Sequence, residues 1–272
     1  MDQVYLITGG GGQLGRALAD VLGEAAVITG LPELDVTSEA SISSAVDRYD
    51  PDVILNCAAV ADVDLCQRRP DLAGLVHVTG VENLAATGRR LLTISTDHVF
   101  TGTPGMTKPF TEGSPTCPAN VYGQSKLMGE APVLEAREDN IVIRTSWMFS
   151  DGNGLCPFLW RELFGRGRVR AVRDQRACMT YAPDLAAKIV DMLQEGAGGL
   201  YHLANPPGVT PAELAHFLVH FTGGTVEEID WHELDLDAPR PFYSELGTVR
   251  DHNLPSLDDA LERWRRSYVR RS

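Results

Sequence analysis

The sequence predicts an α/β fold in which a doubly wound parallel sheet is joined to a smaller C-terminal lobe. Short apolar segments of strand length alternate with amphipathic helical patterns along most of the 272 residues. The predicted strands are residues 4–8, 26–29, 53–57, 91–95, 141–144 and 200–203. This alternation is typical of a parallel sheet with helices on both faces.

A glycine-rich turn, Gly9 to Gly15, follows the first predicted strand and precedes a predicted helix. Glycines at positions 9, 12 and 15 allow a tight turn, close approach of the backbone to a pyrophosphate, and packing of the helix on the strand. The N-terminus of the helix attracts phosphate charge. We therefore predict a Rossmann dinucleotide site here; a flexible turn without a ligand is the alternative.

Polar clusters also follow several later strands, and ligands of parallel sheets bind at the carboxyl ends of the strands. These clusters are Asp35-Val36, residues 56–59, Ser95-Thr96-Asp97 and Thr145-Ser146-Trp147. Residues 101–118 are rich in Gly, Pro and Thr and show no periodicity. We predict a loop at 101–118 that covers the site formed by these clusters.

Tyr122 and Lys126 lie four residues apart in a predicted helix, so their side chains share one face. A phenol has a reference pKa of about 10, and a nearby cation lowers it. The pair therefore predicts a tyrosine acting in proton transfer, although the same spacing is common on helix surfaces.

The pattern becomes less regular after Trp147. Helices are predicted at 158–164 and 181–193, and Thr210 to Glu213 form a capping box that begins another helix. We predict a Rossmann domain at 1–150 and 178–205 and a substrate-binding lobe at 151–177 and 206–272, with the substrate cleft between them.

Composition excludes several classes of protein. Twenty-four Lys and Arg against 37 Asp and Glu give a net charge of -13, which argues against a nucleic-acid partner. No apolar run is long enough to span a membrane, and no basic leader precedes the first strand. The five cysteines contain no Cys-x-x-Cys, so we predict reduced thiols and no metal site. We expect a cytoplasmic enzyme, either a monomer or a homodimer.

Several motifs in order along the chain resemble those of extended short-chain dehydrogenases/reductases. Within that group the chain is most similar to the dTDP-4-dehydrorhamnose reductases, which reduce 4-keto groups of nucleotide sugars. The matching motifs are Gly9 to Gly15, Leu34 to Thr37, Pro51 to Ala59, Ser95 to Phe100, Asn120 to Lys126, Arg144 to Trp147, Asp174-Gln175, Tyr201 to Leu203 and Arg240-Pro241.

The resemblance implies a role for each matching site residue. Reduced nicotinamide would transfer a hydride to a ketone, Tyr122 would protonate the resulting alkoxide, and Thr96 would hydrogen-bond the carbonyl oxygen. Lys126 would bind the nicotinamide ribose and lower the pKa of the phenol. The implied cofactor contacts are Gly9, Gly12, Gln13, Leu14, Asp35, Val36, Ala58, Ala59 and Lys126, and the implied substrate contacts are His98, Trp147 and Arg240.

Two of these residues have structural alternatives. In the family pattern Asp35 contacts adenine, but it could equally serve as a helix-cap neighbour of Thr37. Trp147 could form a wall of the sugar site or anchor the two lobes. The second strand ends in Thr29-Gly30, with neither a carboxylate for ribose hydroxyls nor an Arg for a 2′-phosphate. We expect NADPH as the cofactor, with NADH as the alternative.

Departures from the family pattern concern positions that face the substrate in the family. His98 replaces the usual Tyr, Ala61 replaces Thr, His77 and Pro157 each replace Asn, and the segment from Asp174 to Thr180 differs from its usual form. A lost polar contact can cost about 1–3 kcal/mol. We therefore predict reduction of a 4-keto sugar of secondary metabolism, nucleotide-linked or aminoglycoside-type. The alternatives are a dTDP-4-dehydrorhamnose reductase proper, a non-catalytic NADP-binding regulatory subunit, and an epimerase or dehydratase.

Overall fold

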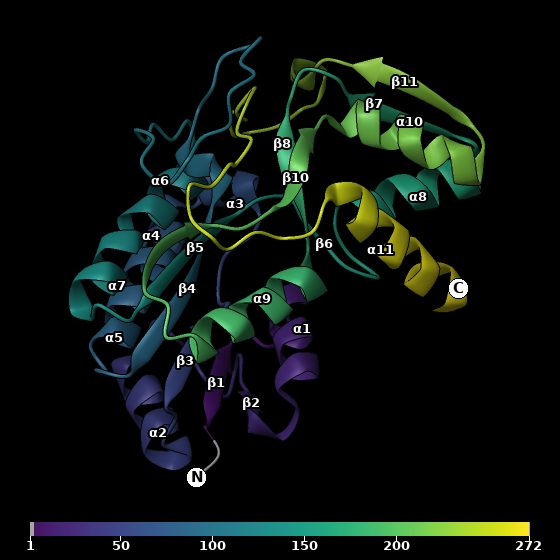
Figure 1. The fold of residues 1–272 in the computed structure, drawn as a ribbon. Coiled ribbons are helices and arrows are strands. Elements are labelled where there is room, and N and C mark those ends of the chain that lie inside the picture. Colours follow the sequence, from purple (N-terminus) through teal and green to yellow (C-terminus); the bar gives the residue numbers. More distant parts are fainter. Residues whose placement is uncertain (1–2, 272) are drawn as a thin grey trace.

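A parallel six-stranded sheet forms the centre of the protein in the computed structural model, which describes residues 3–271. The strand order is β2-β1-β3-β4-β5-β9 (Figure 1). The strands are β1 (Tyr5–Thr8), β2 (Ala26–Ile28), β3 (Val53–Asn56), β4 (Arg90–Thr96), β5 (Ile141–Thr145) and β9 (Gly199–His202). The order changes direction between β1 and β3, which is where such sheets bind ligands. The predicted doubly wound parallel sheet is confirmed.

Helices cover both faces of this sheet because side chains alternate along each strand. Tyr5 and Ile7 of β1 pack under α1 (Gln13–Leu22) and α9 (Ala182–Gln194). Leu6 faces the opposite side, toward α2 (Glu39–Tyr49), α5 (Gly80–Ala85) and α7 (Glu130–Ala136). The helices nearest the site are α3 (Val63–Arg68), α4 (Pro70–Gly74), a π-helical turn (Leu75–Thr79) and α6 (Val121–Met128).

A second lobe is built mostly from the chain after β5 (Figure 1). It contains β6 (Met148–Phe149), α8 (Leu155–Arg166), β7 (Arg168–Val172), β8 (Ala177–Tyr181), β10 (Asn205–Val209), α10 (Pro211–Thr222), β11 (Thr225–Ile229) and α11 (Leu257–Arg271). Its core surrounds the fully buried Trp264. The capping box of Thr210 and Glu213 at the start of α10 is confirmed.

The strands of the second lobe form two small sheets. One has the order β10-β8-β6, and the other pairs β11 with β7. Strand β8 thus pairs with β6 on one side and with β10 on the other, and none of the three joins the six-stranded sheet. The boundaries given above for the two domains stay a prediction.

Residues 101–118 form a loop, but its position differs from the one we predicted. Gly102 forms a bridge with Tyr243, and Phe110 forms one with Leu246. No residue of this loop lines the cavity described below. The expectation that the loop covers the site is therefore wrong, because pairing with the 243–247 segment holds the loop elsewhere.

A buried ion pair braces the strand ends that carry the site. The guanidinium of Arg144 on β5 donates to both carboxylate oxygens of Glu130 on α7, at 2.9 and 2.6 Å. Both side chains are almost fully buried, and the hydroxyl of Ser95 on β4 donates to the same carboxylate. Because Ser95 precedes Thr96, this pair helps to hold Thr96 in place.

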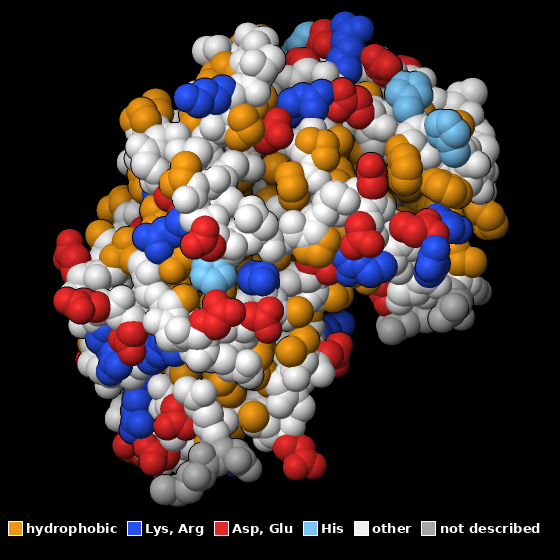
Figure 2. Space-filling view, in the orientation of Figure 1, with side chains coloured by type: hydrophobic (Ala, Val, Ile, Leu, Met, Phe, Trp, Pro, Cys, Tyr) orange, Lys and Arg blue, Asp and Glu red, His pale blue; other side chains and the backbone are white. Residues whose placement is uncertain are grey.

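Charges on the surface are mixed in sign. Figure 2 shows acidic and basic side chains interspersed over the face in view, without one large patch of either sign. Within residues 3–271 no helix combines the length and the apolar composition needed to cross a membrane. The same residues contain no group of three or more His, Cys, Asp or Glu arranged to bind a metal ion.

We predict that Arg144→Met lowers the free energy of unfolding by about 3–5 kcal/mol, because it leaves the Glu130 carboxylate buried without its partner. Urea denaturation measures the change. The matched control is Arg166→Met, which removes an exposed pair with Glu162 one helical turn away and should cost less than about 1 kcal/mol. Equal losses in the two variants would contradict the structural role of the buried pair.

Candidate active site

A cavity of about 770 Å³ lies at the carboxyl edge of the six-stranded sheet. It runs from the glycine-rich turn to the start of the second lobe and collects residues from five strand ends and from α6. The predicted site residues that line it are Gly9, Gly12, Gln13, Leu14, Asp35, Val36, Ala58, Ala59, Thr96, His98, Tyr122, Lys126 and Trp147. Arg240 is the one predicted site residue outside this lining.

The glycine-rich turn packs closely against neighbouring backbone, and the N–H groups at the start of α1 follow it. Gly9 has φ +62°, and a Cβ atom there would lie 2.7 Å from the backbone nitrogen of Ala58. A Cβ atom at Gly15 would lie 2.6 Å from the Cα of Gly10, so glycine allows α1 to pack on the turn. Gly12 caps α1 without a side-chain hydrogen bond, which leaves N–H groups at the helix start for an anion.

Two buried oxygen atoms at the cavity lack protein partners. Gln13 Oε1 and Ser146 Oγ have no hydrogen bond within the described part of the chain, and both residues line the cavity. Buried polar atoms are normally paired, so these two indicate where a polar ligand binds. The lining thus fits a dinucleotide whose polar groups bind these two oxygens. Ser146 was not predicted as a site residue, since in the sequence only its place in the Arg144 to Trp147 motif distinguishes it.

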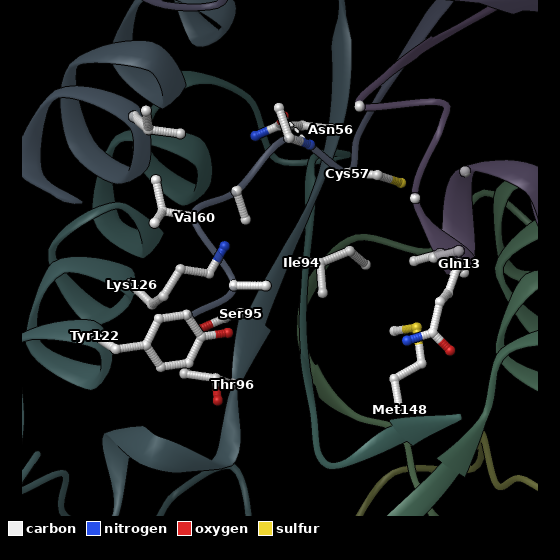
Figure 3. A pocket seen from close by; sticks show the side chains of 18 of the residues that line it. Gln13, Asn56, Cys57, Val60, Ile94, Ser95, Thr96, Tyr122, Lys126 and Met148 are labelled. Atoms are coloured by element: carbon white, nitrogen blue, oxygen red, sulfur yellow. Dashed lines mark hydrogen bonds between the residues drawn. The ribbon is translucent and has the colours of Figure 1, made fainter. Parts of the chain in front are cut away.

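The catalytic candidates converge at the end of β4. Figure 3 shows the Tyr122 hydroxyl pointing toward Ser95 and Thr96 and the Lys126 amine pointing into the cavity beside it, while Gln13 extends toward Met148 on the other side. Burial raises the pKa of Tyr122 to about 12, and the nearby Thr96 hydroxyl, which donates to Asp97 Oδ1 at 3.2 Å, offsets part of this rise. The two hydroxyls therefore lie together, and the phenol keeps its proton at neutral pH.

Lys126 is buried beside the predicted catalytic residues. Burial lowers the pKa of its amine to about 8, against a raising effect of Glu130. Its charge lowers the pKa of Cys57 and of His77, whereas it is not among the groups that shift the pKa of Tyr122. The lowering of the phenol pKa by Lys126 therefore stays a prediction, and burial sets the pKa of Tyr122 in this structure.

Two imidazoles hold the phenol ring edge-on. The His77 and His98 rings lie 5.7 and 5.5 Å from the Tyr122 ring, both nearly perpendicular to it. His77 accepts a hydrogen bond from Val60 N at 3.0 Å, and its other nitrogen lies 2.8 Å from Ser125 Oγ. Burial lowers the pKa of His77 to about 3, so the ring is neutral. The sequence analysis noted His77 only as a departure; the structure places it behind the catalytic helix.

Asp35 and Trp147 each make a structural contact and also line the cavity. The Asp35 carboxylate accepts hydrogen bonds from Thr37 N and Thr37 Oγ1, at 2.9 and 2.7 Å, as a cap neighbour does. Trp147 packs against the core of the second lobe. Both residues nevertheless line the cavity, so each combines a structural contact with a place beside the ligand.

Arg240 binds protein groups. Its guanidinium donates to both oxygens of Asp64 on α3, at 3.1 and 2.9 Å, and to the Ala238 carbonyl at 2.7 Å. These bonds place it behind the cavity wall, so the predicted contact with the substrate has no support in this geometry.

Known proteins are similar to this chain in sequence and in fold. A dTDP-4-dehydrorhamnose reductase of Mycolicibacterium smegmatis is 33% identical over 265 residues, covering 92% of this chain and 80% of that protein. A dTDP-4-keto-6-deoxy-D-glucose reductase of Streptomyces niveus is 34% identical over 259 residues, covering 91% and 89%. The crystal structure of a dTDP-4-dehydrorhamnose reductase from Bacillus anthracis in complex with NADP superposes with a TM-score of 0.89 at 29% identity, covering 98% of this chain and 100% of that chain.

The family model described as the RmlD substrate binding domain matches residues 3–270, nearly the whole chain. This agrees with the resemblance found from the motifs. The chain belongs to the RmlD substrate binding domain family.

Proposed function

We propose that this protein reduces the 4-keto group of a dTDP-linked deoxysugar, with NADPH as the hydride donor. The observation that carries the proposal is the pairing of the Thr96 and Tyr122 hydroxyls beside Lys126, in a cavity that continues to the glycine-rich turn. Relatives that are named dTDP-4-keto sugar reductases support the same reaction.

The cofactor site is supplied by the chain's own backbone and polar atoms. When bound, reduced nicotinamide supplies the hydride. The Gly9 to Gly15 turn and the start of α1 would hold the pyrophosphate, and Gln13 and Ser146 would pair with polar groups of the cofactor or substrate. NADPH is favoured because the Bacillus anthracis relative is described with NADP. The end of β2 also lacks a carboxylate that would repel a 2′-phosphate.

Three side chains perform the remaining chemistry. Thr96 donates to the ketone oxygen and stabilises the negative charge that develops on it. Tyr122 then transfers its proton to that oxygen, and its raised pKa keeps the proton available at neutral pH. Lys126 would hold the cofactor by donating to hydroxyls of the nicotinamide ribose.

For the sugar itself we take the rhamnose precursor, dTDP-4-dehydrorhamnose, as the first candidate. The prediction of a sugar of secondary metabolism rested on departures at family substrate positions. Of these departures, Ala61 and His98 line the cavity, whereas His77, Pro157 and residues 174–180 do not. Fewer changes face the substrate than the sequence suggested, and relatives named dTDP-4-dehydrorhamnose reductases favour the precursor.

A different dTDP-4-keto-6-deoxysugar is the second candidate. Ala61 and His98 do alter the cavity wall, and the Streptomyces niveus relative carries the name of a reductase for such a sugar. A non-catalytic regulatory subunit is disfavoured, because the three groups needed for proton transfer and oxygen binding are present and adjacent.

We predict that Tyr122→Phe lowers kcat about 100- to 10,000-fold, because it removes the proton donor while keeping the ring. The dissociation constant of NADPH should not change. Stopped-flow measurement of NADPH oxidation gives kcat, and fluorescence titration gives the dissociation constant. Full turnover by the Phe variant would refute the assignment of Tyr122.

The pH dependence of kcat/KM should show the ionisation of the Lys126 amine. Its amine is charged below a pKa of about 8 and loses the charge as pH rises through that value. We predict that kcat/KM for reduction falls above about pH 8, since the Tyr122 phenol, with a pKa of about 12, stays protonated there.

Lys126→Arg is the matched variant for this profile, because a guanidinium keeps its charge throughout the range. Its activity should be lower, but the fall above pH 8 should be absent. NADPH binding checks that the variant is folded. An unchanged alkaline fall in this variant would assign the ionisation to another group.

A substrate panel tests the proposed reaction and the order of candidates. We expect NADPH oxidation with dTDP-4-dehydrorhamnose, and slower oxidation with dTDP-4-keto-6-deoxysugars of other configuration. A reversed order would support the second candidate. Tight NADPH binding without oxidation by any keto sugar would instead indicate the regulatory subunit and overturn the proposal.

A further inference from the structure

Asn120 joins the catalytic helix to the second lobe through one buried amide group. Its Oδ1 accepts a hydrogen bond from Gly123 N at 2.8 Å and so caps α6. Its Nδ2 donates to the carbonyl oxygen of Pro239 at 2.8 Å. A backbone N–H can only donate and a carbonyl can only accept, so these two bonds together fix which end of the amide is oxygen and which is nitrogen.

This orientation determines the protonation of His98. Nδ1 of His98 lies 3.0 Å from Asn120 Nδ2, which has a second N–H available. Nδ1 must therefore accept, and the ring proton of neutral His98 resides on Nε2. His98 lines the cavity, and its Nε2 has no hydrogen bond to any described residue.

We propose that Asn120 is a positioning residue that holds His98 in the Nε2–H form, so that His98 presents a hydrogen-bond donor to the sugar. This inference rests on the proposed function for the identity of the ligand, but the ring form itself does not depend on turnover. The sugar atom opposite His98 is then an acceptor oxygen of a hydroxyl or carbonyl group, and a protonated amine is excluded from that position.

The position of the Pro239 carbonyl group, which accepts from Asn120, depends on contacts between residues 237–240 and α3. Asp64 on α3 accepts from Ala238 N at 2.9 Å and binds Arg240, while Arg68 of the same helix pairs with Asp237. The 237–240 segment is thus anchored on both sides of Pro239. Arg240 contributes to the site through this anchor, whereas the sequence analysis assigned it a direct contact with the substrate.

The backbone of α6 packs closely on the backbone of His98, so neither segment can shift toward the other. A Cβ atom at position 123 would lie 2.1 Å from the His98 carbonyl oxygen, so only glycine allows this contact. His98 as a residue is also only 7% exposed. Ring rotation to another partner is therefore restricted, and the donor direction is set by Asn120.

The test is the ring form of His98, read by long-range ¹H–¹⁵N NMR of histidine-labelled protein at neutral pH. The chain contains seven histidines, and the signal that disappears in His98→Gln assigns His98. We expect the Nε2–H form in the unaltered protein. In Asn120→Asp the helix cap is kept, but the carboxylate can only accept, so His98 should change to the Nδ1–H or doubly protonated form.

Gln67→Glu is the matched control for the added charge. Gln67 Oε1 accepts from Val121 N at 3.2 Å, so this variant also places a carboxylate at the start of α6 but away from His98. The His98 signal should keep its Nε2–H form in this control. An Nδ1–H form in the unaltered protein, or no change in Asn120→Asp, would overturn the proposal.

Kinetics test the donor role separately. His98→Phe keeps a ring but removes the donor, and it should raise the KM of the keto sugar about 5- to 100-fold. His98→Gln can place an amide N–H near the same point and should recover much of this loss. Equal KM values for the two variants would overturn the donor role, whereas absence of any keto-sugar reduction in the unaltered protein would refute the proposed function and leave the NMR result to decide the ring form.

Discussion

Every polar side chain buried at the carboxyl edge of the sheet requires a hydrogen-bond partner, because an unpaired group costs about 1–3 kcal/mol. The hydroxyl of Thr8 donates to Asn56, whose amide donates to Thr93, at 2.7 and 3.0 Å. The Ser95–Glu130–Arg144 cluster continues this pairing toward β5. The network therefore fixes the ends of four strands, β1, β3, β4 and β5, relative to one another. The two oxygens that it leaves unpaired in the cavity, on Gln13 and Ser146, identify where ligand groups complete it.

Burial also sets the acid–base properties of the proposed catalytic groups. It favours the neutral form of each, so it raises the pKa of Tyr122 to about 12 and lowers that of Lys126 to about 8. A protonated phenol suits reduction, in which the ketone oxygen receives a proton. Lys126 is mostly charged at neutral pH, but its pKa of about 8 lies only about one unit higher. The burial that keeps the proton on Tyr122 therefore also makes the Lys126 amine lose its charge in mild alkali.

Local sequence patterns predicted those features that depend on residues close together in the sequence. The length of the apolar segments identified the strands, and the spacing of Gly9, Gly12 and Gly15 identified the turn at the cavity. Contacts between distant segments could not be read in this way. Asn120 and Pro239 are 119 positions apart, and the bond between them determines which nitrogen of His98 carries the proton. The 101–118 loop was misplaced for the same reason, since its position is set by pairing with residues 243 to 247.

The cavity wall formed by Ala61 and His98 then has a definite chemical character. A Thr and a Tyr, the usual family residues at these positions, each carry a hydroxyl that can donate or accept. Alanine does neither, and His98 in its Nε2–H form only donates. The wall has therefore lost acceptors while keeping one donor. His77, by contrast, has both ring nitrogens engaged with Val60 and Ser125, so its replacement of Asn changes the support of α6 and not the sugar contact. Selection between sugars at this wall thus depends on whether an acceptor oxygen faces His98.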